Sequence, residues 1–138
     1  NAEFAVFEGS SADMVRYAVR QWWQHMGGTA ASGIAKLVMT EARQVPEIAE
    51  FYRSEVIVPG NELLGRILQR GMDRGEFRPM DLTHGIYSLV APMTLLLLWK
   101  HAMAPCIDPQ LPLDPQAFLE TQTELLLGGL TLADRHVR

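Results

Sequence analysis

The sequence predicts an all-α domain, and three observations support this fold class. Apolar residues recur at spacings of three and four, no segment alternates apolar and polar residues for long enough to form a sheet, and helix-start and helix-stop residues divide the chain into five helical segments. A chain of 138 residues can bury a sizeable core without disulfides. We expect one domain over residues 10–138, a bundle of five to six helices, preceded by a linker at residues 1–9.

The first helix is expected to run from Ser10 to about Met26. Ser10 and Asp13 have the spacing of a capping box, in which the two side chains satisfy backbone amides of the first turn. Gly27 and Gly28 then end the helix. The helical spacing predicts one inward apolar stripe, widened by Trp23, that consists of Val15, Ala18, Val19, Trp22 and Met26.

The second helix is expected at about residues 29–44. Its inward positions include Glu41, which lies three residues after Val38 and four after Leu37. A partly buried carboxylate needs a hydrogen-bond partner, because burial without one costs several kcal/mol. Two kinds of partner remain open for Glu41: a nearby arginine or helix N-terminus, and a bound ligand.

The third helix begins at Pro46, because first-turn amides have no helical partner and a proline loses nothing there. Further on, Pro59 and Gly60 predict a bend or a short break near Val58. The glycines expected to end this helix are Gly71 and Gly75.

The fourth helix is expected to begin with Asp81 as its cap and to continue to about Ala102. Pro92 lies in its middle and predicts a second kink. Two interpretations of Pro59 and Pro92 stay open. They are tolerated irregularities, or they bend the helices so that these do not close against each other and a cavity remains.

Residues 103–114 contain three prolines and are expected to form a surface crossover loop. Asp114 and Pro115 then supply a cap and a proline at the first helical position, so a fifth helix is expected, which reaches about Arg135. Its predicted inward residues are Phe118, Leu125, Leu126, Gly129, Leu130 and Ala133.

The fourth and fifth helices carry leucines around much of their circumference. A helix that is apolar on most sides must be covered on most sides, and the same two helices of a second copy would cover them in a four-helix bundle. Gly128 and Gly129 would let the backbones approach closely at this seam. The sequence therefore predicts a homodimer whose interface residues are Leu89, Leu96, Phe118, Gln122, Leu125, Leu126, Gly129 and Leu130.

Charge and composition exclude several classes of partner. A net charge of −4 and a pI near 5.5 give a surface that repels phosphate, so this region itself is not expected to bind nucleic acid. The single cysteine, Cys106, cannot form an intrachain disulfide and suits a cytoplasmic protein. The apolar run Ile86–Trp99 is shorter than the ~20 residues that span a bilayer, so we expect a core helix and no membrane partner.

Enzyme motifs are absent from the sequence. No glutamate is followed by histidine three residues later, as a di-iron bundle requires, and no zincin, nucleophile-elbow, phosphate-loop or dinucleotide motif occurs. The four histidines are scattered near predicted helix ends. We therefore expect a binding module that uses neither cofactor nor metal, rather than an enzyme.

Aromatic and sulfur side chains of the first four helices are the candidate ligand-binding residues. Aromatic rings provide stiff apolar contacts and thioethers adapt to irregular shapes, so they suit a small apolar or aromatic effector. Each of them could instead be an ordinary core residue. Tyr52 and Tyr87 are favoured, because a buried phenol needs a hydrogen-bond partner. The full set is Trp22, Trp23, Met26, Met39, Phe51, Tyr52, Tyr87, Met93 and Trp99.

Two motifs carry a family resemblance. One is Glu-Ala-Arg-x-x-Pro-Glu at residues 41–47, which joins two helices, and the other is Arg-Gly-Glu-Phe-Arg at residues 74–78, followed by Asp81. This order of parts resembles the C-terminal ligand-binding and dimerisation region of TetR/AcrR-type transcriptional regulators, over roughly residues 10–134. We expect the N-terminal helix-turn-helix domain of such regulators to be absent from this chain.

The resemblance implies a homodimer that regulates transcription, acting as a repressor that an effector releases from operator DNA. Contact with the operator would be made only through the absent N-terminal domain. Two other classes of function remain: a stand-alone helical carrier of hydrophobic ligands or protein-docking module, and, ranked last, a small α-helical enzyme.

Overall fold

A computed structural model describes residues 7–27, 32–100 and 113–132 of the chain. Its α-helices are α2 (Ser11–Trp22), α3 (Ser32–Glu41), α4 (Pro46–Tyr52), α5 (Val58–Asp73), α6 (Leu82–Leu98) and α7 (Pro115–Leu130). Two π-helical turns, η1 (Trp23–Gly27) and η2 (Arg53–Ile57), extend α2 and α4. The described residues contain no strand, only one isolated bridge between Phe77 and Thr131, so the predicted all-α class is confirmed.

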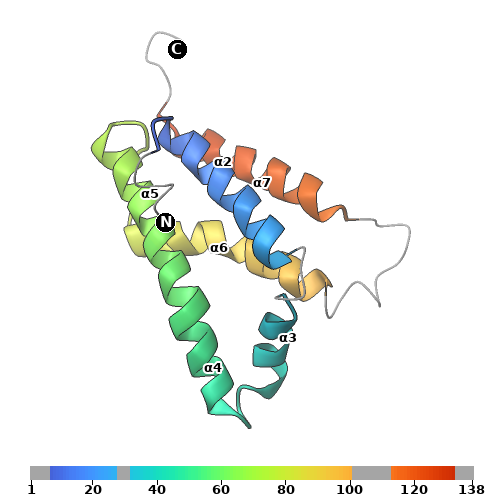
Figure 1. Cartoon of the computed structure of the whole chain (residues 1–138). Coiled ribbons are helices and arrows are strands. Elements are labelled where there is room, and N and C mark those ends of the chain that lie inside the picture. Colours follow the sequence, from blue (N-terminus) through green and yellow to red (C-terminus); the bar gives the residue numbers. More distant parts are fainter. Residues whose placement is uncertain (1–6, 28–31, 101–112, 133–138) are drawn as a thin grey trace.

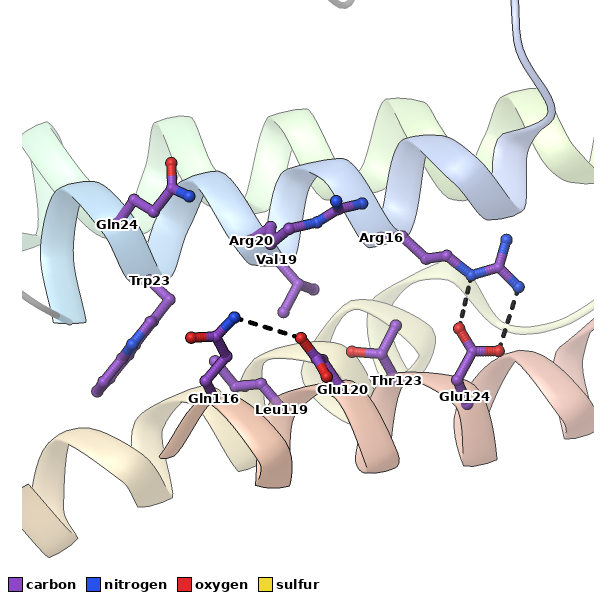
Figure 2. Close-up of a pocket in the computed structure, with 10 residues that line it drawn as sticks. All are labelled: Arg16, Val19, Arg20, Trp23, Gln24, Gln116, Leu119, Glu120, Thr123 and Glu124. Carbon is purple, nitrogen blue, oxygen red and sulfur yellow. Dashed lines mark hydrogen bonds and ion pairs between the residues drawn. The ribbon is translucent and has the colours of Figure 1, made fainter. Parts of the chain in front are cut away.

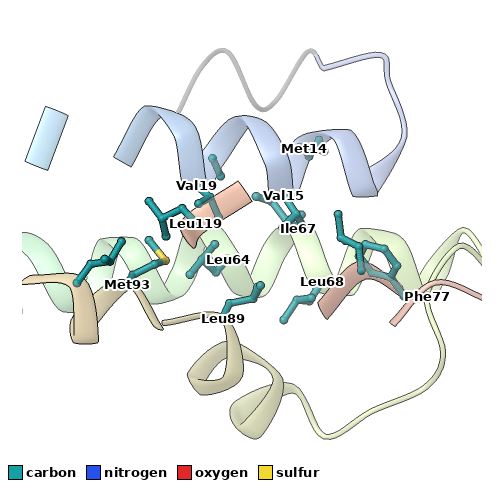
Figure 3. Close-up of a cluster of buried hydrophobic side chains, with 13 residues drawn as sticks. Met14, Val15, Val19, Leu64, Ile67, Leu68, Phe77, Leu89, Met93 and Leu119 are labelled. Carbon is teal, nitrogen blue, oxygen red and sulfur yellow. The ribbon is translucent and has the colours of Figure 1, made fainter. Parts of the chain in front are cut away.

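Four helices enclose the hydrophobic core. α2 packs against α5 and α7, and α6 packs against the same two helices, so the four close into a bundle (Figure 1). The shorter α3 and α4 extend beyond one end of this bundle and contact each other (Figure 1). Among the described residues, no helix is both long and apolar enough to cross a membrane. Buried side chains that fill the bundle include Val15, Val19, Ile67, Leu68, Phe77, Leu89, Leu96 and Leu119 (Figure 3).

The helical path from Pro46 to Asp73 is continuous, so of the predicted bend or short break near Val58 the break is absent, and a π-helical irregularity lies directly before that residue. The chain passes from α4 through the π turn at Arg53–Ile57 into α5, and the Val58 N–H donates to the Arg53 carbonyl, five residues back. Pro59 follows at once and has no N–H to donate. The wider turn is a common local adjustment where the ordinary helical ladder is disturbed, and it keeps the helix intact.

The two glycines expected to end α5 have different roles. Gly75 has a φ of 73°, and it follows the helix in the left-handed conformation that terminates it. The Glu76 N–H donates to the Gly71 carbonyl at 2.9 Å and the Gly75 N–H to the Met72 carbonyl at 3.1 Å, which is the Schellman pattern. Gly71 lies inside the helix, where a Cβ would overlap the Phe77 ring.

α7 ends five residues before the expected Arg135. Thr131 has an extended backbone and forms the bridge with Phe77. The Arg78 N–H donates to the Leu130 carbonyl and the Leu132 N–H to the Glu76 carbonyl, both at 3.0 Å. The loop after α5 therefore holds the chain extended where the helix was expected to continue. Ala102, the loop at 103–112 and Ala133 lie outside the described residues.

The inward face of α7 is also rotated from the prediction. Leu119, Thr123 and Leu127 are buried, whereas Leu125 is 74% exposed and Gly129 is exposed. The inward assignment of Leu125 and Gly129 is therefore wrong. The other predicted inward residues that the structure describes, which pack partly buried against the core, are Phe118, Leu126 and Leu130.

Candidate dimerisation face and ligand pocket

A groove of about 380 Å³ lies on the outer side of α6 and α7, next to the end of α5. Leu125 and Gly129 of α7 face it from one side and Ser88 of α6 from the other. A Cβ added to Gly128 or Gly129 would meet no atom within 4 Å, so the α7 backbone is uncovered here. We call this surface the α6–α7 face. The residues that line its groove are Leu68, Met80, Asp81, His84, Gly85, Ser88, Leu89, Leu125, Leu126, Gly129 and Leu130.

The structure brings together only part of the predicted interface. Five of its residues line this one groove, namely Leu89, Leu125, Leu126, Gly129 and Leu130. Leu96, by contrast, is 0% exposed inside the core of the chain, and Leu89 is 4% exposed at the bottom of the groove. Phe118 and Gln122 are partly buried on α7 and do not line it. The exposed Leu125 is therefore the most prominent apolar side chain of the α6–α7 face.

A second pocket, of about 360 Å³, lies between α2 and α7 (Figure 2). We call it the α2–α7 pocket. Its floor is apolar, because Val19 and Leu119 are both buried, and Trp23 forms one end wall. The buried Thr123 also lines it, and its hydroxyl is directed toward Glu120 in Figure 2.

Charged side chains surround the mouth of the α2–α7 pocket. Arg16 Nε donates to Glu124 Oε1 at 2.6 Å, and Arg16 Nη2 donates to Glu124 Oε2 at 3.2 Å. Arg16 also pairs with Asp13 at 2.8 Å. The hydrogen bond to Glu124 is the main cause that raises the pKa of Arg16, and the same bond lowers the pKa of Glu124. This ion pair ties α2 to α7 across 108 residues of sequence.

The predicted ligand-binding side chains do not converge on one site. Among the members whose side chains the structure describes, only Trp23 lines the α2–α7 pocket, and the Trp22 ring lies beside it, tilted, at a centroid distance of 6.2 Å. Met93 is buried in the core, whereas Phe51 and Tyr87 are 56% and 57% exposed. The remaining described members, all partly buried, are Met26, Tyr52 and Trp99.

Tyr52 and Trp99 each bury a polar group of the side chain at least in part. Burial raises the pKa of the Tyr52 phenol. The indole Nε1 of Trp99 is buried and has no hydrogen-bond partner within the described part of the chain. The side chain of Met39 lies outside what the structure describes. Glu41 is the last residue of α3 and is partly buried.

Sequence reasoning missed the charged members of the α2–α7 pocket. A signal for them existed, because Arg16 and Arg20 are four residues apart on one helix, and Glu120 and Glu124 are four apart on another. Each pair alone is typical of a solvated helix face. Only the packing of α2 against α7 places the two pairs opposite each other.

The first described residues of the chain are held by the loop after α5. Arg70 donates to the Gly9 carbonyl at 2.7 Å and to Ser11 Oγ at 2.9 Å. Glu76 accepts a hydrogen bond from the Ser11 N–H at 2.7 Å. Glu76 belongs to the Arg-Gly-Glu-Phe-Arg motif at residues 74–78, and Arg70 lies four residues before that motif. We call these hydrogen bonds of Arg70 and Glu76 to Gly9 and Ser11 the clasp. The clasp fixes the position at which the chain enters α2.

A helical bundle with a pocket and an uncovered two-helix face has the architecture of a ligand-binding and dimerisation domain. Residues 8–109 match the family described as "Tetracyclin repressor-like, C-terminal domain". The chain therefore belongs to this family, and it is a regulatory domain of the TetR type. No curated protein matches the chain, and no solved structure does.

Proposed function

We propose that this chain is the effector-binding and dimerisation domain of a TetR-type regulator, and that it dimerises through the α6–α7 face. The regulator acts as a repressor that a small apolar or aromatic ligand releases from DNA. Family membership supports the regulatory class. In this proposal, the described helices bind the effector and the second copy, and they do not contact DNA.

The observation that supports this proposal most directly is that the α6–α7 face is uncovered in a single chain. Leu125 is 74% exposed and Leu95 is 44% exposed, and both lie on the outer side of the bundle's last two helices. Full burial of an exposed leucine side chain is worth roughly 1.5–3 kcal/mol, so Leu125 would gain most of this free energy and the half-covered Leu95 less than half of it. A two-fold axis through this face would place each Leu125 against the groove of the other copy, because an isologous interface uses the same surface twice.

The position of α7 supports a link between ligand and DNA. α7 lines the α2–α7 pocket with Glu120 and Glu124, and it carries Leu125 on another side. A dimer must hold two reading helices roughly 34–36 Å apart to meet both half-sites. A ligand that prefers a different spacing of α2 and α7 shifts the dimer away from the DNA-competent state by its differential affinity.

Light scattering after size exclusion tests the proposed interface. We expect the wild-type chain to elute as a dimer at micromolar concentration and Leu125→Glu to elute as a monomer with unchanged helical circular dichroism. The charge would be buried against an apolar groove without a partner. Ile57→Glu is the matched control, since Ile57 is 42% exposed and lies away from this face. A monomeric wild type, or a dimeric Leu125→Glu variant, contradicts the proposal.

A further inference from the structure

α2 and α7 run antiparallel and face each other with two successive pairs of opposite charge. Arg16 and Glu124 form the first pair and are joined at 2.6 Å. One helical turn further along, Arg20 of α2 and Glu120 of α7 line the same pocket without being joined (Figure 2). The Arg20 side chain has no hydrogen bond or ion pair within the described residues, and the Glu120 carboxylate accepts only the Gln116 side-chain amide, at 3.4 Å.

The space between Arg20 and Glu120 is occupied by the pocket itself. Trp23 closes its far end, and the floor beneath is made by Val19 and Leu119, which are 6% and 4% exposed. Volumes of ligand sites range over about 300–1,000 Å³. A pocket of about 360 Å³ is therefore at the small end and suits a molecule of about amino-acid size.

Thr123 points to a polar ligand. This residue is only 4% exposed and lines the pocket, and its hydroxyl has no hydrogen-bond partner among the described residues. A ligand that fills the pocket would displace the water to which this hydroxyl can otherwise hydrogen-bond, and an unreplaced hydrogen bond would weaken binding. A polar ligand atom beside Thr123 would restore that hydrogen bond.

Arg20 and Glu120, on opposite sides of the pocket mouth, indicate which charges the ligand carries. Arg20 and Glu120 are both exposed at the mouth, and a molecule that fills the pocket would cover part of each side chain. A simple anion would pair with Arg20 and leave Glu120 without a cation, and a simple cation would do the reverse. An uncompensated charge is costly, so a ligand with both charges satisfies the site best.

We propose that the α2–α7 pocket binds an aromatic zwitterion, with its carboxylate on Arg20, its ammonium group on Glu120 and its ring against Trp23 and the apolar floor. The proposal rests on the ligand-binding function proposed above and names the chemical class of effector. Because Glu120 lies on α7, the ligand joins α2 to the helix that carries Leu125.

Calorimetric titration of the 138-residue chain tests the ligand class with three probes that share a phenyl ring. L-Phenylalanine carries both charges, phenylacetate carries only the negative one, and phenethylamine only the positive one. We expect L-phenylalanine to bind, and each analogue to bind at least ~10-fold more weakly, since one charged side chain then stays unpaired. Equal binding of all three, or binding of an analogue alone, overturns the proposal.

Substitutions test the assigned residues. Arg20→Gln should weaken L-phenylalanine binding at least ~10-fold, and it should abolish the preference for L-phenylalanine over phenethylamine, because the carboxylate then has no cation to pair with. Glu120→Gln should abolish the preference over phenylacetate in the same way. The matched controls are Arg66→Gln and Glu62→Gln, which alter exposed positions on α5 outside the pocket. Loss of binding in the controls as well, or none in the two pocket variants, contradicts the assignment.

The failure of this inference is distinguishable from the failure of the proposed function. If a dimeric chain releases or absorbs no heat with L-phenylalanine, the ligand class is wrong and dimerisation through α6 and α7 stands. If the chain is monomeric, the proposed function fails, whatever the titration shows.

Discussion

At the scale of single residues, the contact between Gly71 and Phe77 is the tightest constraint on the sequence. Phe77 is 1% exposed, and its ring lies against the α5 backbone at Gly71, where any Cβ would overlap it. Phe77 also forms the bridge that ends α7. One glycine therefore permits α5, the following loop and the end of α7 to meet.

Gly71→Ala should destabilise the chain by about 1–3 kcal/mol, because the added methyl group must displace the buried Phe77 ring. Gly60→Ala is the control on the same helix, where a Cβ would meet nothing within 4 Å. That substitution should be neutral or stabilise by up to about 1 kcal/mol, since alanine favours helix over glycine. Urea denaturation measures both changes, and equal stabilities of the two variants would refute the steric account.

Glu76 makes the stability of the clasp depend on pH. Burial acts to raise the pKa of its carboxyl, but hydrogen bonds from Ser11 and the charges of Arg74 and Arg70 outweigh it and lower the pKa below the ordinary value of 4.5. A lowered pKa in the folded state means that this carboxylate stabilises the fold above the unfolded-state pKa. The stabilisation is lost as the pH falls through the folded-state pKa.

The difference in unfolding free energy between wild type and Glu76→Gln should therefore be constant at neutral pH and shrink below about pH 4.5. Denaturation at a series of pH values measures it. Glu62→Gln removes one negative charge from an exposed site on α5 and serves as the control. A wild-type advantage that persists unchanged to about pH 3 would contradict the role assigned to Glu76.

At the scale of helices, starts are determined locally and were predicted. Ser10 Oγ accepts the Asp13 N–H at 3.1 Å at the start of α2, and Pro46 and Pro115 begin α4 and α7 as their positions indicated. These signals need only neighbouring residues. Helix starts were for this reason the most predictable part of the fold.

Ser10→Ala should cost about 1 kcal/mol of stability, because the Asp13 amide loses its acceptor, and Ser10→Asp should retain most of it. Thermal unfolding followed by circular dichroism compares the two. Both variants leave the buried Ser11 unchanged. An equal loss in Ser10→Asp would show that the cap does not act through its side-chain oxygen.

The end and the rotation of α7 could not be predicted from neighbouring residues. Leu125, Leu126 and Leu127 are consecutive and equally apolar, so hydropathy alone does not tell which one faces the core. Packing against α2 and α6 decides it and buries Leu127. The end of α7 depends on a bridge to Phe77, a residue more than fifty positions earlier in the sequence.

At the scale of the whole molecule, the sequence predicted the uncovered surface better than the pocket. The prediction that the last two helices form a dimer interface rested on their apolar composition, and the structure leaves a groove between these helices exposed. The ligand-binding residues were chosen by side-chain type, and type does not determine position. Trp23 is the one member of that set in the α2–α7 pocket, and its charged neighbours come from two separate helices.

The account of the whole molecule depends on a second copy covering the α6–α7 face. Leu125 is 74% exposed in one chain and Ile57 is 42% exposed, so a single chain offers more of Leu125 to solvent. NMR line broadening of leucine and isoleucine methyl groups by a soluble paramagnetic agent measures that accessibility in the unmodified protein. We predict that Leu125 is protected while Ile57 is broadened. Stronger broadening of Leu125 than of Ile57 would contradict dimerisation through this face.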